Sequence, residues 1–408
     1  MSEALTCDSS CVNFDINYKL RYDKSIKYNQ SLTLYMTCMI RAQTVGQASC
    51  SERSLSSMRR VEITANLSPK ILQVLQTLLD LDLTTIEAAW SACRESGRGY
   101  FVQQIRQAPT GKVREIHTPR PAVYQVQRKI LRRVLYALPI SRSAYGGVPK
   151  RSHIGAARVH LEQTGEVLQT DIIDAFGQTT YGEISRVLRR ALKPMMWSLA
   201  LERSERKIMV GWLTHMMVIS PEGGRYPRLP LGTPTSMAAF NLVWSELDAA
   251  IIALCHDLSP ESPLRYTRYV DDLTFSGETP LSPELLPRLR HLLKNHRYQL
   301  NEEKTRRAPR EQAIVHGLCW RDGRVDLPDP AIINLAQRAH RLNQLLVGAP
   351  TTTEWTRAAH LIKELDLLVH EIYGDAPRPQ GLMIHPEVRD RVKAHQHQPA
   401  RWADELWG

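Results

Sequence analysis

Two adjacent carboxylates lie in a stretch of chain whose flanks favour β-structure. The segment 265–277 reads "RYTRYVDDLTFSG", and Asp271 and Asp272 separate its tyrosine-containing half from a second β-prone run. Asp-Asp is a good turn dipeptide, so the simplest interpretation is a hairpin tip that faces water. The alternative is a metal site, because hard divalent cations bind carboxylate oxygens and offset the repulsion between like charges. A motif this short often occurs by chance, so the rest of the chain must decide.

A third carboxylate ends another strand-like segment, well upstream. Asp171 lies in "EVLQTDIIDAF", a predicted strand that ends in carboxylates. An aspartate at the end of one strand and an Asp-Asp hairpin in a neighbouring strand of the same sheet can together hold two divalent cations. Phosphoryl transfer by two metal ions needs such a site, because one ion activates the attacking hydroxyl and the other stabilises the leaving group. Asp174 could be a ligand or the N-cap of the following helix, and it is left out of the predicted metal set.

Basic residues outnumber acidic ones, and they are unevenly distributed. The chain has 53 Lys and Arg against 42 Asp and Glu, a formal net charge of +11. Eight basic residues and no acidic one lie between 120 and 151, and a second basic block runs from 288 to 310. A charge run is usually a solvated surface, but two acid-poor blocks flanking a candidate metal site favour a polyanionic partner. Nucleic acid is therefore the leading class of partner.

The composition is that of a soluble globular protein. The chain has 408 residues, 43% of them hydrophobic and 23% charged, so it can bury a substantial core, and its length indicates two or three domains. No uninterrupted apolar run approaches the roughly 18 residues that cross a bilayer, and the N-terminus lacks the pattern of a secretory signal. We therefore expect a cytoplasmic protein with no membrane partner. The seven cysteines are too scattered for a disulfide framework or a zinc site and are predicted to be free thiols.

Hydrophobic periodicity predicts the elements that position these residues. The tail from Ala376 is polar and contains prolines. The predicted strands and hairpins are 99–121, the run ending at 171, 265–277, and the short "AIVHGLCW" at 313–320. The predicted helices are 68–96 with Ser68 as N-cap, 122–138, 179–192, the long segment that follows "RLPLGTPTS" and reaches 258, 282–298, and 330–374.

The predicted helix 122–138 is amphipathic. Its apolar residues follow helical spacing, which leaves Arg128, Arg132 and Arg133 elsewhere on its surface. These three arginines are predicted nucleic-acid contacts, because Arg and Lys supply most of the affinity for phosphate backbones.

The motif "YVDD" resembles the Tyr-X-Asp-Asp signature of reverse transcriptases, and further motifs of that family occur in the same order. "GKVREIHTPRP" resembles the fingers motif that grips the triphosphate, "DIIDAF" the palm motif, and "LPLGTPTSMAAFNLVWSELD" the loop and helix after it. "LNEEKT" resembles the lysine-bearing motif, and "IVHGLCW" the strand that follows. The resemblance runs from about Tyr100 to Trp320. These ordered matches outweigh the turn-only interpretation, and Asp171, Asp271 and Asp272 are predicted to be the catalytic metal ligands.

The resemblance implies roles for single residues in binding the nucleotide. Lys112 and Arg114 match basic residues that hold the triphosphate, a ligand that suits bidentate arginine, although either could be a surface charge. Phe176 matches the aromatic gate against a ribose 2′-hydroxyl, with plain core packing as the alternative. Lys304 matches the lysine that approaches the active site, and binding of the phosphate backbone is the alternative.

Several segments resemble the retron branch of bacterial reverse transcriptases. "RYVDDLTFSG" and "SHIGAARVH" carry this likeness, although "AARVH" replaces the usual Asn-Ala-X-X-His and "VHG" the usual Val-Thr-Gly. His160 and His316 in these segments are candidate nucleic-acid contacts, and for His160 a structural histidine is the alternative. Leu231 stands where the family usually has a glutamine near the incoming nucleotide. The competing interpretations are a defence-associated antiphage reverse transcriptase that makes repetitive or template-light DNA, and a polymerase-inactive RNA-binding defence module.

The resemblance implies an α+β fold, a right-hand polymerase with fingers, a palm on an antiparallel sheet, and a helical thumb. The implied activity is RNA-directed DNA polymerisation in antiphage defence, with two Mg²⁺ ions as cofactor and Mn²⁺ as a substitute. The implied partners are a structured noncoding RNA, its DNA product and deoxynucleoside triphosphates, with an effector protein or a second copy of the chain as further candidates. The predicted division is an N-terminal extension at 1–57, N-terminal helices and fingers at 58–160, the palm with fingers elements at 161–325, and a helical thumb with a C-terminal tail at 326–408.

Overall fold

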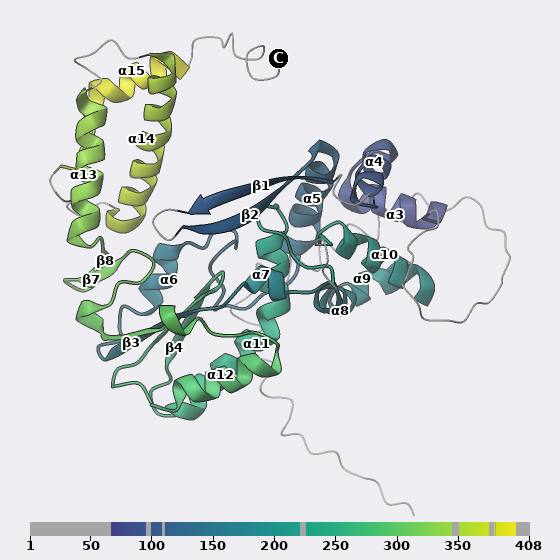
Figure 1. Ribbon diagram of the computed structural model, residues 1–408, viewed down its shortest axis with the longest axis horizontal. Coiled ribbons are helices and arrows are strands. Elements are labelled where there is room, and N and C mark those ends of the chain that lie inside the picture. Colours follow the sequence, from purple (N-terminus) through teal and green to yellow (C-terminus); the bar gives the residue numbers. More distant parts are fainter. Residues whose placement is uncertain are drawn as a thin grey trace, which may run out of the picture. The chain divides into compact units, whose positions relative to one another are not determined.

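The computed structural model is a mixed helix and sheet protein whose sheets are antiparallel (Figure 1). The predicted N-terminal extension at 1–57 lies outside the described residues, and the four-part division predicted from the sequence stays a prediction. The structure describes residues 67–94, 99–107, 111–220, 226–344, 351–374, 379 and 381–396. The chain divides into a first unit, Met1–Pro149 with Ile173–Ala250 and Leu292–Gln299, and a second unit, Lys150–Ile172 with Ile251–His291 and Leu300–Gly408.

The helix predicted over 68–96 is two helices. Asp80 adopts a left-handed conformation with φ 54°, which ends the first of them. Ser68 caps this helix as predicted, since its Oγ accepts a hydrogen bond from the amide of Ile71 at 3.3 Å. The helices of the first unit include α3 (Pro69–Leu79), α4 (Leu83–Arg94), α5 (Pro121–Arg133) with the 3₁₀ turn η2 (Leu135–Ala137), α7 (Ala175–Gln178), α8 (Tyr181–Ala191), α9 (Lys193–Ser198) and α10 (Arg203–His215).

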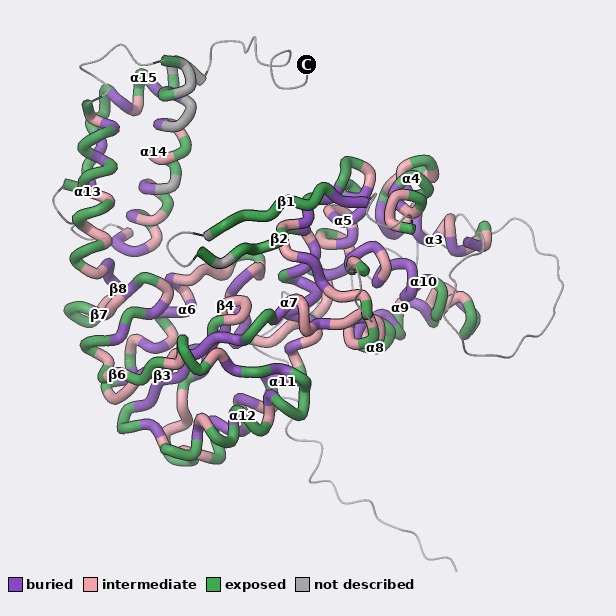
Figure 2. The backbone as a smooth tube through the Cα atoms, viewed as in Figure 1, coloured by how far each residue is buried: buried purple, intermediate pink, exposed green. Residues whose placement is uncertain are grey.

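The hairpin predicted over 99–121 is present in the first unit. Strands β1 (Tyr100–Gln107) and β2 (Lys112–Pro119) pair in antiparallel register, with Tyr100 opposite Pro119. Residues 101–106 are all exposed, and Figure 2 shows both strands mostly in the colour of exposed residues. The hairpin therefore offers its side chains to solvent rather than to a core.

The long helix α11 (Ser236–Leu258) begins in the first unit and continues into the second. By length and composition it could cross a membrane, but 61% of its most apolar window is buried inside the protein. Glu246 and Asp248 interrupt its apolar run, which is why the sequence shows no uninterrupted span. Its Phe240 and Trp244 lie against Tyr298, with ring centroids 6.3 and 4.9 Å apart, so the helix builds the aromatic core of the first unit.

The second unit contains a four-stranded antiparallel sheet with the strand order β4-β5-β3-β6. β3 lies inside this sheet, with β5 on one side and β6 on the other, and its Val167 and Leu168 are buried. Short helix α6 packs on β4. The bounds are α6 (His153–Val159), β3 (Glu166–Asp171), β4 (Arg265–Tyr269), β5 (Asp272–Ser276), η3 (Glu302–Lys304), β6 (Arg306–Pro309) and η4 (Arg310–Gln312), with α12 (Leu285–Asn295) beginning in this unit.

The strand predicted over 313–320 is much shorter in the structure. Val315 and Leu318 pair across a tight turn, with hydrogen bonds of 2.8 and 3.0 Å, and only Cys319–Arg321 forms the strand β7. His316 and Gly317 in the turn have φ of 53° and 78°, a backbone that a continuous strand cannot contain. β7 pairs with β8 (Arg324–Asp326).

Three helices complete the second unit: α13 (Asp329–Gln344), α14 (Thr352–Tyr373) and α15 (Pro386–Gln396). The first two were predicted as a helical region, whereas α15 falls in the polar tail from Ala376, for which no helix was predicted. Tyr373 anchors α14, because its hydroxyl donates to Asp326 Oδ1 at 2.6 Å and its ring joins a core cluster with Trp320 and Val167. α13 and α14 therefore share a core with the sheets of this unit, whereas Val388 and Val392 of α15 pack in a second cluster with those two helices.

Candidate active site

The three predicted metal ligands meet at one edge of the four-stranded sheet. β3 and β5 are neighbours, and their register places Asp171 directly opposite Asp272. One carboxylate oxygen from each of Asp171, Asp271 and Asp272 lies within 4.8 Å of the others. Among the residues that the structure describes, no other group of three or more acidic, histidine or cysteine side chains is arranged in this way. The strand ends that the sequence placed far apart are therefore adjacent in space.

A tight turn presents the Asp-Asp pair. Tyr269 pairs with Asp272, so only Val270 and Asp271 connect β4 to β5. Val270 has φ 59°, in the left-handed region that β-branched residues rarely adopt. Arg268 Nη1 donates a hydrogen bond to the carbonyl oxygen of Val270 at 2.9 Å, and this arginine is fully buried. The turn is thus held in a strained form from inside the unit.

Lys304 and Asn301 contact the buried member of the cluster. The ammonium of Lys304 lies 2.7 Å from Asp171 Oδ2, and the side-chain amide of Asn301 lies 3.4 Å from the same oxygen. The Asn301 main-chain amide also donates to the Asp171 carbonyl at 2.7 Å, which ties the segment before η3 to the end of β3. The hydrogen bond to Asp171 raises the pKa of Lys304 above its usual value, so this side chain is a cation at neutral pH.

The cluster holds more negative charge than Lys304 can balance. Loss of hydration and then the charges of Asp271 and Asp171 raise the pKa of Asp272 to about 7, although this residue lies at the exposed rim of the site. All three donors are carboxylate oxygens, the ligands that hard divalent cations prefer. The donor set and the raised pKa therefore fit one or two such ions.

The residues predicted to bind the nucleotide lie mostly in the first unit. Arg114 is exposed on β2, and Lys112 is the first residue of that strand, with its side chain outside the described part. Phe176 lies on α7, half-buried, with its ring edge-on to Phe240 at 5.6 Å. Asp174 occupies the N-cap position of α7 with φ 43° but makes no capping hydrogen bond through its side chain. The roles of Lys112, Arg114 and Phe176 stay predictions.

The three arginines of α5 differ in their surroundings. Arg128 donates to the hydroxyl of Tyr124 at 3.2 Å, and Arg132 is exposed on the last turn. Arg133 lies 3.1 Å from Asp80, which offsets its charge. Because an exposed pair of this kind is weak, a phosphate can compete with Asp80 for Arg133.

The two predicted histidine contacts are not equivalent. His160 is fully buried, and both ring nitrogens are engaged: Nδ1 lies 2.6 Å from Ser276 Oγ and Nε2 2.8 Å from Thr267 Oγ1. The geometry therefore favours the structural alternative, because no ring nitrogen remains for a nucleic acid. His316 is half-buried, with its ring 5.1 Å from that of Tyr269.

Sequence reasoning missed two residues of the site. Arg268 and Asn301 stand inside quoted motifs, but neither was assigned a role. For Arg268 the available signal was its place in the predicted strand "RYTRYV", next to the Asp-Asp pair. A guanidinium that such a strand buries must be hydrogen-bonded to its surroundings. Asn301 gave no comparable signal, since its partner Asp171 is distant in the sequence.

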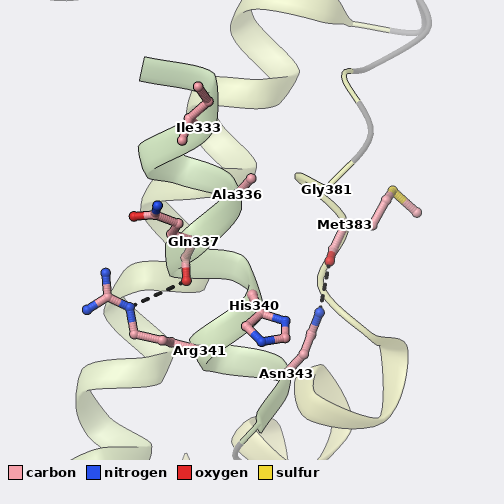
Figure 3. A pocket seen from close by; sticks show the side chains of 8 residues that line it. All are labelled: Ile333, Ala336, Gln337, His340, Arg341, Asn343, Gly381 and Met383. Atoms are coloured by element: carbon pink, nitrogen blue, oxygen red, sulfur yellow. Dashed lines mark hydrogen bonds between the residues drawn. The ribbon is translucent and has the colours of Figure 1, made fainter. Parts of the chain in front are cut away.

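The surface of α13 carries a separate hollow of about 670 Å³. Figure 3 shows the His340 ring lying between the helix and the segment at Gly381, and Asn343 donating to the Met383 carbonyl at 3.1 Å. Among its described lining residues none carries a carboxylate or a thiol, so these residues do not supply the ligands of a hard-metal site. It is lined by Ile333, Ala336, Gln337, His340, Arg341, Asn343, Gly381 and Met383.

Comparison with known proteins gives two curated relatives from Myxococcus xanthus. The chain is 33% identical to the retron Mx65 reverse transcriptase over 218 residues, which is 52% of this chain and 49% of the relative. It is 29% identical to the retron Mx162 reverse transcriptase over 214 residues, 48% of this chain and 42% of the relative. The predicted resemblance to retron-type bacterial reverse transcriptases is thereby confirmed, although the chain spans about half the length of the curated relatives it matches.

Two further comparisons add little. No family model matches the chain. The solved structure of apo telomerase from Candida tropicalis is 14% identical, covers 54% of this chain and 46% of that chain, and gives a TM-score of 0.36. A likeness of that size carries no argument about this protein.

Proposed function

We propose that this protein is an RNA-directed DNA polymerase of the retron type. The observation that carries the proposal is the cluster of Asp171, Asp271 and Asp272 at the paired ends of β3 and β5. Similarity to two retron reverse transcriptases over about half of the chain supports it. In this proposal the exposed β1–β2 hairpin belongs to the fingers, the four-stranded sheet is the palm, and α13 to α15 form the thumb.

The cluster would hold Mg²⁺, with Mn²⁺ as a substitute. Two such ions, when bound, supply the chemistry of phosphoryl transfer by activating a hydroxyl and stabilising the pyrophosphate that leaves. The chain's own residues position the oxygen donors: the β3–β5 register holds Asp171 against Asp272, and the turn at Val270 adds Asp271. Lys304 and Asn301 orient the Asp171 carboxylate through contacts on the same oxygen.

Other residues would select and bind the substrates. Arg114 and Lys112 would grip the triphosphate of a deoxynucleotide, since Arg offers a bidentate fork and Lys a point charge. Phe176 would exclude ribonucleotides by filling the space of the 2′-hydroxyl. Arg128 and Arg132 would bind the phosphate backbone of RNA.

The partner would be a structured noncoding RNA that serves as template, and the product a DNA copy of it. We place the complex in the cytoplasm, in antiphage defence, with an effector protein or a second copy of the chain as a further partner. The net charge of +11 supports a polyanionic partner, and structured RNA is read largely by its shape.

The direct test uses two variants of the full chain, Asp271→Asn and Asp272→Asn. With Mg²⁺, deoxynucleotides and a primed RNA template, each should lose polymerisation, because an amide is a poorer ligand for a hard cation than a carboxylate. RNA affinity should not change. Asp322→Asn is the matched control, since Asp322 is exposed in the β7–β8 turn, where φ of 50° also suits asparagine. Full synthesis by both site variants would refute the proposal.

A second measurement separates the competing functions. Nucleic acid that copurifies with the protein should contain a defined RNA and a DNA copy of it. A repetitive DNA product would instead favour template-light synthesis, an interpretation that Leu231 in place of glutamine keeps open. RNA without any DNA would favour a binding module.

A further inference from the structure

We propose that Arg268, His316 and His160 are positioning residues, which hold the β4–β5 hairpin so that Asp271 and Asp272 face Asp171. The proposal rests on the proposed polymerase function, because it assigns these side chains to the catalytic hairpin rather than to RNA. Two of them, His160 and His316, were predicted from the sequence to contact nucleic acid.

The tip of the hairpin needs support because its backbone is strained. The connection consists of Val270 and Asp271, and Val270 has φ 59°. A β-branched side chain crowds the backbone in this region, so such a conformation persists only when its surroundings impose it. If the support is removed, the turn can relax, and the carboxylates on either side of it move with the backbone.

Arg268 supplies support from inside the unit. It is fully buried on β4, two residues before the strained position, and its Nη1 donates to the Val270 carbonyl at 2.9 Å. A buried guanidinium is costly unless its donors are satisfied, and its planar fork fixes the directions in which they point. The Val270 carbonyl is therefore held by a rigid group.

Two histidine rings support the tip from the side of Tyr269. The ring of His316 lies 5.1 Å from that of Tyr269, and the ring of His153 lies edge-on to it at 6.3 Å. His316 is itself in a tight turn, with φ 53°, so its ring is presented by a fixed backbone. Burial, and then the nearby His153, lower the pKa of His316 to about 4. A neutral ring suits packing on Tyr269 better than binding to a phosphate.

His160 fixes the base of the same hairpin. Thr267 belongs to β4 and Ser276 to β5, and one imidazole contacts both hydroxyls, at 2.8 and 2.6 Å. Burial is the main cause that lowers the pKa of His160 to about 3, so the ring is neutral and each nitrogen can serve one hydroxyl. The hairpin is thus held at its base by His160 and at its tip by Arg268 and the rings on Tyr269.

The decisive comparison is between His316→Phe and His316→Ala. Phenylalanine keeps an aromatic ring but has no nitrogen, so a packing role survives this change and a hydrogen bond to RNA does not. His316→Ala should lower kcat about tenfold, since small displacements of catalytic groups are costly, with the deoxynucleotide KM and the RNA Kd within about twofold of wild type. His316→Phe should keep most of kcat. His340→Ala, which removes an exposed imidazole on α13, is the control and should behave as wild type.

The outcome that overturns the assignment of His316 is a loss of RNA affinity that is equal in the Phe and Ala variants. That result would make His316 a nucleic-acid ligand. Equal losses of kcat in the Phe and Ala variants, without any change in RNA affinity, would also contradict packing of the His316 ring on Tyr269.

The tip itself is tested with Val270→Gly and Arg268→Lys, because Arg268→Met risks unfolding the sheet. Glycine adopts φ 59° without strain, so Val270→Gly should raise the Tm. Because glycine also lets the turn adopt other conformations, the same variant should weaken Mn²⁺ binding and lower kcat. Arg268→Lys keeps the charge but loses the fork, and it should also weaken Mn²⁺ binding.

Mn²⁺ binding to the full chain is measured by electron paramagnetic resonance without substrates. Unchanged Mn²⁺ affinity in both variants would refute the positioning role of the turn. This readout is independent of polymerisation, so it still tests the proposal if the wild-type protein proves inactive and the proposed function fails.

Discussion

Replacing Lys304 by methionine should tighten metal binding at the aspartate cluster. The Lys304 ammonium lies 2.7 Å from Asp171 Oδ2, so a cation that takes this oxygen must displace the lysine or share the oxygen with it. The Lys304 side chain is 55% exposed and that of Asp171 8%, so the pair lies between an exposed and a buried salt bridge. An exposed pair contributes up to about 1 kcal/mol, and an energy of that size corresponds to about fivefold in an equilibrium constant.

The assay is isothermal titration of Mn²⁺ into the full chain without RNA or nucleotides. The titration should be run above pH 8, where Asp272 is ionised in both proteins. Nearer its pKa of about 7, protons compete with Mn²⁺ for this carboxylate. Lys304→Met should bind Mn²⁺ about fivefold more tightly than wild type, by the energy above. Lys363→Met is the matched control, since Lys363 is exposed on α14, and it should leave the affinity unchanged. Equal or weaker binding by Lys304→Met would show that the lysine supports the metal site instead of competing for it.

Four further predictions concern nucleotide selectivity, the pH dependence of metal binding, the pH dependence of stability, and RNA binding. Phe176→Ala should raise the ratio of ribonucleotide to deoxynucleotide incorporation in competition assays. An unchanged ratio would show that Phe176 only packs in the core beside Phe240. Mn²⁺ affinity should fall by up to about tenfold per pH unit below 7 and level off above it, because the ion displaces the proton of Asp272; affinity that is flat between pH 5.5 and 7 contradicts the raised pKa. Without metal, folded Asp272 holds its proton more tightly than Asp272 in the unfolded chain does. The free energy of unfolding, measured by urea denaturation, should therefore fall as the pH rises from about 4 to about 7. Arg128→Gln with Arg132→Gln should weaken RNA binding and reduce the slope of log Kd against log salt by up to about one unit per lost contact, and an unchanged slope would exclude both from the phosphate interface.

The sequence predicted those parts of the molecule that local patterns determine. The long helices, the hairpin predicted at 99–121 and the strand that ends at Asp171 each carry their own periodicity, and ordered motifs linked Asp171 to the Asp-Asp pair. α15 was missed because, among its residues whose burial the structure describes, Val388 and Val392 are the buried hydrophobics, too few for an amphipathic pattern. The break at Asp80 was missed because its left-handed backbone has no glycine to mark it.

The contacts around the site could not be predicted in the same way. Lys304 reaches Asp171 because the segment after α12 returns to the end of β3, and His160 reaches Thr267 and Ser276 because α6 packs beside the hairpin. Such contacts join residues more than 100 positions apart. From its residue type alone, His160 could be an RNA ligand or a structural histidine. Its full burial favours the structural role.

The position of β3 inside its sheet has a consequence for biosynthesis. β3 ends at Asp171, but its partners β5 and β6 span Asp272–Ser276 and Arg306–Pro309, so both neighbours are translated long after it. Until then a strand with two core residues, Val167 and Leu168, has no partner on either edge, a state that exposes it to misassociation. A chain interrupted before Asp272 has no second carboxylate strand, and one interrupted before Pro309 has an incomplete sheet. The aspartate cluster therefore cannot assemble on the ribosome before β5 has been made, and its sheet is complete only after β6 has followed.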